Sequence, residues 1–147
     1  MINMKIYTIG FTKKSAKFFF TKLRDAGITK VIDVRLNNVS QLAGFAKRDD
    51  LIFFLSELCA CEYIHLPEWA PTKEILDSYK KKKIDWSEYV FSFSKLIDER
   101  KIEKKFSAEE LNNACLLCSE STPEQCHRRL VAEYLKEKFD NIELYHL

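Results

Sequence analysis

The chain has 147 residues, which suit a single domain that buries roughly two-thirds of the surface exposed by its unfolded form. Hydrophobic residues make up 46% of the chain, as in packed globular proteins, and no apolar run approaches the ~20 residues that a membrane helix needs. The formal net charge is only +2, from 24 basic and 22 acidic residues, which excludes an overall field that recruits nucleic acid.

The N-terminal segment MINMKIYTIGF lacks the basic start, long apolar centre and cleavage site of a secretory signal. We therefore expect an intracellular, cytoplasmic protein with no membrane partner. Its five cysteines, at positions 59, 61, 115, 118 and 126, are then expected to be thiols. Their odd number and irregular spacing also argue against a disulfide framework.

Runs of β-branched and apolar residues predict strands, and apolar residues at helical spacing predict helices between them. The first half of the chain predicts a strand at Lys5–Ile9, a helix from about Ser15 to Gly27, a strand at Lys30–Val34, a helix from about Asp49 and a strand at Glu62–Leu66. The second half predicts two helices within Thr72–Lys105 that break near Ile84 and Asp85, a strand at Asn113–Cys118, a helix from about Pro123 to Lys138 and a strand at Ile142–Leu147. This alternation predicts a single compact α/β domain with a mainly parallel sheet of about five strands flanked by helices.

In such a sheet, ligands usually bind outside the carboxyl ends of the strands. The residues that follow the predicted strands would therefore share one rim. They are Gly10 and Thr12 after the first strand, Asp33, Arg35, Asn37 and Asn38 after the second, His65 and Glu68 after the third, and Cys118, Ser119 and Glu120 after the fourth. Asp33 and Arg35 leave the same face of an extended chain, where they could pair or both meet a ligand.

The segment CSESTPEQCHRR, residues 118–129, contains a helix-start signature. Thr122 would be the N-cap, Pro123 the first helical residue and Gln125 the partner in a capping box. On this helix His127 would lie in the middle of the apolar face and point toward the sheet. Arg128 would lie at the border of that face, while Arg129 would point to solvent beside Glu133, four residues later.

The cysteine pattern C-x2-C-x7-C-H offers four soft metal ligands. Cys115 and Cys118, three apart on a strand, would however project from opposite faces, so we predict no metal. Cys126, near a helix start and beside basic groups, has reasons for a lowered pKa and could be a reactive thiolate. The alternative is that Cys126 is a small buried hydrophobic residue, as free cysteines often are.

Two interpretations remain open for the basic residues. His127 could be an acid/base group, or a buried imidazole held by a backbone carbonyl or by a carboxylate such as Glu120 or Asp33. The helix N-terminus, together with Arg35 and Arg128, could bind a phosphate, sulfate or carboxylate without covalent chemistry. The segment GFTKKS, residues 10–15, lacks the glycine and lysine order of a P-loop, and we predict no cofactor.

Five segments of the chain resemble the family called domain of unknown function 488 (DUF488). They are YTIGFT from Tyr7, VIDVR from Val31, YIHLPE from Tyr63, CSESTPEQCHRRLVAEYL from Cys118 and the closing YHL. Many members carry histidine where this chain has Phe11, so a role of that histidine does not carry over. The resemblance implies a compact α/β fold with shared polar residues at the strand ends, and it implies no settled activity.

Together these features predict a pocket at the carboxyl edge of the sheet for an anionic ligand that carries phosphate, such as a nucleotide or a nucleic-acid end. The predicted ligand-binding residues are Gly10, Thr12, Arg35, Asn37 and Arg128, and the predicted catalytic residues are Asp33, Glu120, Cys126 and His127. In that scheme His127 is the acid/base candidate, because the ordinary histidine pKa lies near neutral pH. The alternatives are a non-catalytic module that binds a ligand or a protein, and a cysteine-dependent enzyme of sulfur transfer or redox chemistry.

Overall fold

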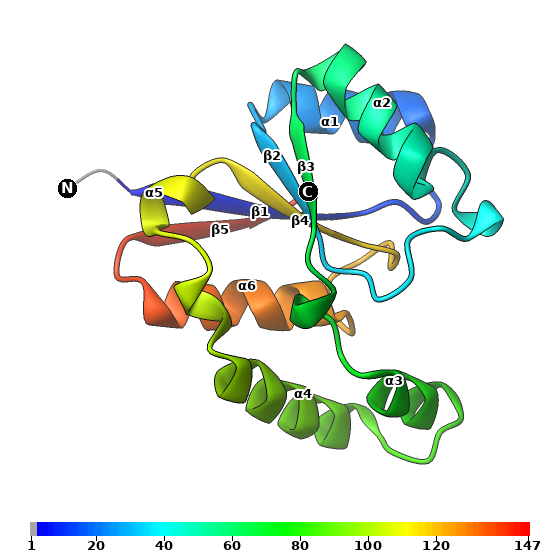
Figure 1. Cartoon of the computed structure of the whole chain (residues 1–147), viewed down its shortest axis with the longest axis vertical. Helices are drawn as coiled ribbons and strands as arrows, with labels where there is room; N and C mark the ends of the chain where they lie inside the picture. The colour runs from blue at the N-terminus through cyan, green and yellow to red at the C-terminus, as the bar shows by residue number, and fades with distance from the viewer. Residues whose placement is uncertain (1–2) are drawn as a thin grey trace.

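The computed structural model describes residues 3–147, and these residues form one sheet of five parallel strands. The strands are β1 (Met4–Gly10), β2 (Lys30–Asp33), β3 (Glu62–His65), β4 (Ala114–Cys118) and β5 (Ile142–His146). Their order across the sheet is β3-β2-β4-β1-β5, so the first and last strands of the chain are neighbours (Figure 1). The predicted α/β domain with a parallel sheet is confirmed.

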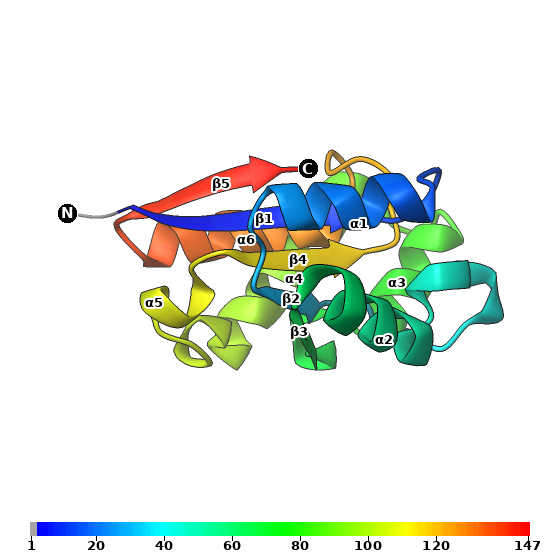
Figure 2. The ribbon, with the colours of Figure 1, turned by 90° about the horizontal axis from the view of Figure 1, so that it is seen from above.

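Helices cover both faces of the sheet. The helices are α1 (Ala16–Asp25), α2 (Arg48–Cys59), α3 (Lys73–Lys80), α4 (Trp86–Arg100), α5 (Ala108–Leu111) and α6 (His127–Lys138). Figure 1 shows α1 and α2 above the sheet and α6 with α4 below it, and Figure 2 shows β3 and β5 at opposite edges. Among the described residues, no helix is both long enough and apolar enough to cross a lipid bilayer.

Each face of the sheet has its own hydrophobic core. Leu116 packs with the residues of α4 and α6, whereas the next residue, Leu117, packs with those of α1 and α2. Successive side chains of a strand point to opposite faces, so a strand covered by helices on both faces is apolar throughout. All five residues of β4 are accordingly buried, which explains the unbroken apolar run ACLLC.

Side-chain caps define where most helices begin. The Ser15 hydroxyl accepts a hydrogen bond from the Phe18 N–H at 3.1 Å, at the start that the sequence predicts for α1. Asp85 and Glu88 form a capping box that starts α4, with the Glu88 N–H donating to Asp85 Oδ1 at 2.8 Å. The predicted break near Ile84 and Asp85 is thus confirmed, because it separates α3 from α4.

The predicted start of the last helix is wrong. Residues 119–125 form turns rather than helix, and α6 begins at His127 with an extended Cys126 (φ −131°, ψ 137°) as its N-cap. Thr122 does not cap a helix, since its side chain hydrogen-bonds to Glu124 and lowers the pKa of that carboxyl. The segment instead forms a turn that crosses the end of β1, and contacts with β1 and the loop after it hold it there.

Candidate functional site

A cavity of about 500 Å³ lies at the carboxyl edge of the sheet, between the strand ends and α3. Its lining residues are Arg35, Leu36, Asn37, Lys73, Leu76, Asp77, Tyr79, Lys80, Tyr89, Cys118, Ser119, Glu120, Gln125, Cys126 and His127. The lining includes five of the predicted site residues: Arg35, Asn37, Glu120, Cys126 and His127. The cavity therefore lies at the predicted rim, and several of the predicted residues converge on it.

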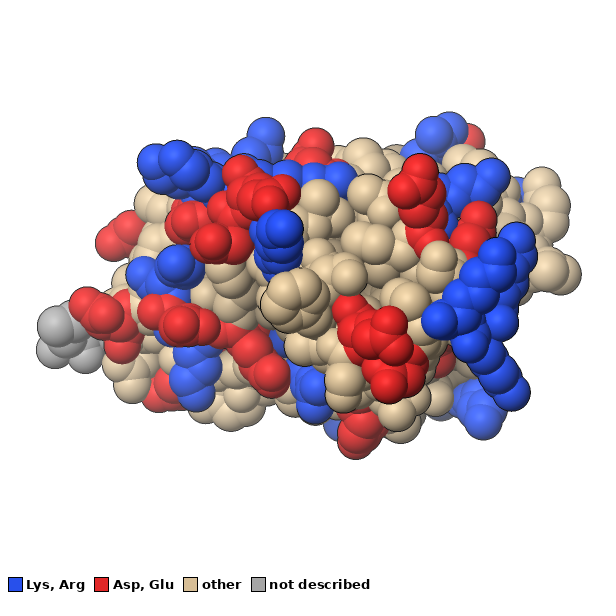
Figure 3. Space-filling view, turned by 90° about the horizontal axis from the view of Figure 1, so that it is seen from below, with Lys and Arg blue, Asp and Glu red and all other residues tan. Residues whose placement is uncertain are grey.

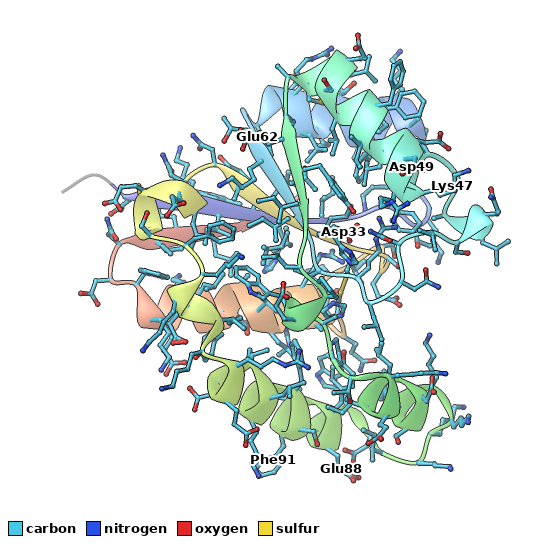
Figure 4. All side chains as sticks on the ribbon, in the orientation of Figure 1. Asp33, Lys47, Asp49, Glu62, Glu88 and Phe91 are labelled. Carbon is cyan, nitrogen blue, oxygen red and sulfur yellow. A yellow bond between two sulfur atoms is a disulfide. The ribbon has the colours of Figure 1, made fainter. Side chains whose placement is uncertain are left out.

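Arg35 and Asp33 form a buried ion pair at the end of β2, with side chains 4% and 0% exposed. Arg35 Nε and Nη2 donate to the two carboxylate oxygens at 2.8 and 2.7 Å, and the Arg35 backbone N–H donates to Oδ1 at 3.1 Å. The Tyr63 hydroxyl donates to Oδ2 at 2.6 Å. Figure 4 shows Asp33 inside the molecule, near the end of β2. Of the two alternatives for these residues, the structure shows the pairing, and four hydrogen bonds occupy the Asp33 carboxylate.

Gly10 and Thr12 hold the turn that links β4 to α6. A Cβ added at Gly10 would overlap the Glu120 carbonyl oxygen and lie 2.6 Å from its carbon, so only glycine admits this close approach. The Thr12 N–H donates to the Ser119 carbonyl at 3.1 Å, and Lys14 Nζ donates to the Ser121 carbonyl at 3.1 Å. Neither Gly10 nor Thr12 lines the cavity, although both were predicted to bind the ligand.

Arg128 is wholly buried, at 0% exposure, so its predicted position at the border of the helix face is wrong. The late start of α6 leaves its guanidinium free to reach back across the end of β1. There Nη1 donates to the Glu120 carbonyl at 2.6 Å, and Nε donates to Thr8 Oγ1 at 3.3 Å. Nη2 is buried without a hydrogen-bond partner among residues 3–147, and no carboxylate of that range forms an ion pair with Arg128.

The structure joins Cys118 and Cys126, whose Cα atoms are 7.7 Å apart, as a disulfide. The expectation that all five cysteines are thiols is therefore wrong for this pair, because the turn between β4 and α6 brings the two residues together. Cys59, Cys61 and Cys115 are free. Burial raises the pKa of all three, that of Cys61 to about 12. Cys115 packs in the core under α1 and α2, on the opposite face from Cys118, as predicted.

His127 points inward, as predicted, and its Nε2 is 2.6 Å from the Val34 carbonyl oxygen. Because a carbonyl can only accept, Nε2 carries the proton of this bond, and Nδ1 is the acceptor in the neutral ring. Burial, with a further contribution from Arg128, lowers the pKa of His127 to about 4. The acid/base assignment assumed an ordinary histidine pKa, and that assumption is wrong here. The ring is neutral at physiological pH.

This low pKa makes folding stability depend on pH. Between about pH 6.5 and pH 4 the unfolded chain binds a proton at His127 that the folded chain does not bind, so stability falls as the pH falls through this window. The full effect is about 3 kcal/mol for a pKa lowered to about 4. His127→Gln keeps a donor for the Val34 carbonyl but cannot titrate. We therefore expect the free energy of unfolding of this variant to fall less than that of the wild type as the pH is lowered. Urea unfolding of both proteins between pH 7 and pH 4.5 measures it, and parallel stability curves would contradict the assignment.

Sequence reasoning missed the wall of the cavity that α3 and α4 form. Lys73, Leu76, Asp77 and Lys80 lie on one face of α3 at helical spacing and line the cavity. The Tyr79 hydroxyl donates to Gln125 Oε1 at 3.0 Å, which ties α3 to the turn before α6. Figure 3 shows Lys and Arg side chains gathered at the end of the molecule where α3 lies. The amphipathic spacing of α3 could have indicated this face. It could not have indicated that the face lines a cavity at the strand ends.

One family model matches the chain. It is described as domain of unknown function DUF488 and matches residues 15–135, which are 121 of the 147 residues. No curated protein and no solved structure matches the chain. All residues that line the cavity lie within the matched range. Because the match spans most of the sequence, the chain belongs to the DUF488 family.

Proposed function

We propose that the cavity binds an anionic ligand that carries phosphate, of the nucleotide or nucleic-acid-end type. The observation that carries this proposal is the convergence of Arg35, at the end of β2, with Lys73 and Lys80 of α3 on one concave surface. Cys126 and His127, at the start of the 12-residue helix α6, complete that surface. A helix N-terminus has amides without intrahelical partners and attracts anions, as do the two lysines. The charge of Arg35 is already paired with Asp33, so Arg35 can add hydrogen bonds from its remaining Nη1 group rather than a free charge.

The remaining lining favours a ligand with more than a phosphate. Glu120 and Asp77 can accept hydrogen bonds from hydroxyl or amino groups, while Tyr79 and Tyr89 offer aromatic faces. A volume of about 500 Å³ lies within the roughly 300–1,000 Å³ of small-molecule sites. This combination of cationic, acceptor and aromatic groups suits a phosphate joined to a sugar and a base better than inorganic phosphate alone.

The geometry supports binding more directly than acid/base catalysis. Asp33 already accepts four hydrogen bonds and orients Arg35, so we assign it a positioning role. His127 donates Nε2–H to Val34 and is neutral, which leaves Nδ1 as an acceptor. Glu120 is the exposed carboxylate that lines the cavity from the turn after β4, and it remains the candidate for contact with the ligand.

The double variant Lys73→Ala/Lys80→Ala is expected to bind phosphate-bearing ligands roughly tenfold more weakly, because each lysine contributes about 0.5–1 kcal/mol of charge attraction. Calorimetric titration with nucleoside mono-, di- and triphosphates and a short 5′-phosphorylated oligonucleotide measures this, with inorganic phosphate as a further probe. Lys17→Ala/Lys136→Ala is the matched control, since it removes the same charge from exposed positions on α1 and α6. Absence of binding by every probe, or an equal loss in the control, would contradict the proposal.

A further inference from the structure

We propose that Cys118 and Cys126 are a redox-active pair that exchanges electrons with low-molecular-weight disulfides through the cavity, with Arg128 as the counter-ion of the reduced form. This inference goes beyond ligand binding, and it does not depend on which anion occupies the cavity. Three observations carry it: the position of the two sulfur atoms, the unpaired charge of Arg128, and the contrast with the three free cysteines.

Both cysteines border the cavity at the carboxyl edge of the sheet. Cys118 is the last residue of β4 and Cys126 is the N-cap of α6, and both line the cavity, although their side chains are only 1% and 3% exposed. Access is therefore limited to reagents that enter the cavity. Cys61 and Cys115 are buried in the opposite core and do not line it.

The charge of Arg128 is the second observation. Arginine is rarely fully buried without a charged partner, because an unpaired buried charge is costly. Arg128 has no carboxylate partner among residues 3–147, yet Nη1 lies 3.2 Å from the Cys118 sulfur and 3.5 Å from the Cys126 sulfur. A thiolate on either sulfur would supply the missing negative charge. The disulfide supplies none, so the guanidinium favours the reduced pair over the oxidised one.

This arrangement matches what thiol chemistry requires. Cationic neighbours and a helix N-terminus favour the thiolate, which is the nucleophile in disulfide exchange. A disulfide whose reduced form is stabilised in this way is a better oxidant than an ordinary structural disulfide. For the three free cysteines, burial raises the thiol pKa and outweighs the opposite effect of Arg24 on Cys59 and of Arg128 on Cys115. The same fold therefore separates one reactive pair from three unreactive thiols.

In the oxidation of the reduced pair, a small disulfide RSSR is the oxidant and accepts the two electrons. The Cys126 thiolate attacks one sulfur of RSSR, the S–S bond breaks, and RS⁻ leaves and takes up a proton as RSH. Cys118 then loses its proton and attacks the Cys126 sulfur of the mixed disulfide, which forms the Cys118–Cys126 bond and releases the second RSH. Two electrons pass from the protein dithiol to RSSR, and the reverse sequence reduces the protein disulfide.

The test equilibrates the whole protein with mixtures of reduced and oxidised glutathione, quenches with acid, and maps alkylated peptides by mass. We expect the 118–126 disulfide to form and break as the ratio changes, while Cys59, Cys61 and Cys115 stay alkylatable after unfolding. Cys59→Ser/Cys61→Ser is the matched control and should behave as the wild type. A 118–126 disulfide that never forms, or that persists at every ratio until the protein unfolds, would overturn the proposal.

Two variants separate the roles within the pair. Cys118→Ser should trap the mixed disulfide of glutathione on Cys126, because the resolving sulfur is gone. Arg128→Gln should slow iodoacetamide labelling of reduced Cys126 at pH 7 by at least tenfold, and Arg128→Lys should restore part of the rate. If Arg128→Gln does not fold, the pH profile of wild-type labelling decides, and a midpoint at the ordinary thiol pKa of about 8.5 would refute the role of Arg128.

Discussion

Replacing Arg35 with methionine is expected to lower the free energy of unfolding by about 3–5 kcal/mol, because it leaves the Asp33 carboxylate buried without its counter-ion. Asp33 is 0% exposed, and Arg35 supplies three of the four hydrogen bonds that it accepts. After the substitution only the Tyr63 hydroxyl and the backbone N–H of residue 35 would still donate to the carboxylate. Urea unfolding at pH 7, followed by circular dichroism, measures the loss.

The double variant Asp33→Leu/Arg35→Met distinguishes an unpaired charge from poor packing. It removes both charges, so it should recover much of the stability that Arg35→Met loses. It should also free the Tyr63 hydroxyl, whose pKa both burial and Asp33 raise in the native protein. If the single and double variants are equally unstable, the loss comes from the shape of the arginine side chain rather than from its charge.

Gly10→Ala is expected to lower the free energy of unfolding by about 3 kcal/mol, the upper end for overpacking, because the added methyl group meets backbone. Gly10 ends β1 and pairs with Cys118 of β4, and the Glu120 carbonyl occupies the space that a Cβ needs. The turn between β4 and α6 would have to move away from β1. The stability loss should therefore be accompanied by a lower yield of the 118–126 disulfide, which mass mapping detects.

Gly27→Ala is the control for the backbone cost of replacing a glycine. Gly27 has φ +73°, but nothing lies within 4 Å of an added Cβ, so its substitution strains the backbone without a clash. We expect a loss of about 1 kcal/mol and no change in disulfide yield. A Gly10 variant no less stable than the Gly27 variant would show that the turn moves aside easily.

The sequence predicts the framework of this protein well because local signals determine it. Ser15 caps the helix that was expected to start there, Asp85 caps the helix that follows the predicted break, and the apolar run of β4 fits a strand buried on both faces. The pairing of Asp33 with Arg35 follows from a separation of two residues on an extended chain. Such features depend on neighbours in the sequence, so no tertiary contact is needed to foresee them.

The errors lie where tertiary contacts override local preference. TPEQ has the composition of a helix start, yet contacts of residues 119–121 with Thr12, Lys14 and Arg128 hold this segment as a turn. The burial of Arg128 follows from that turn, and helical spacing counted from a start near Pro123 could not predict it. The cavity wall formed by α3 was missed for a similar reason. The prediction collected residues that directly follow a strand, whereas α3 reaches the cavity only through the way it packs in the folded protein.

The half-buried helix α3 is the least deeply packed wall of the cavity. None of its eight residues is buried, and one side-chain hydrogen bond, from Tyr79 to Gln125, ties it to the turn before α6. The sheet and α6, which carry the other side of the cavity, belong to the hydrophobic core. Because Ile75, Leu76 and Tyr79 of α3 pack against that core, and the Tyr79 ring centroid lies 5.0 Å from that of Tyr89, an outward displacement of α3 would expose apolar surface. A ligand too bulky for the cavity would have to offset that cost with its own contacts.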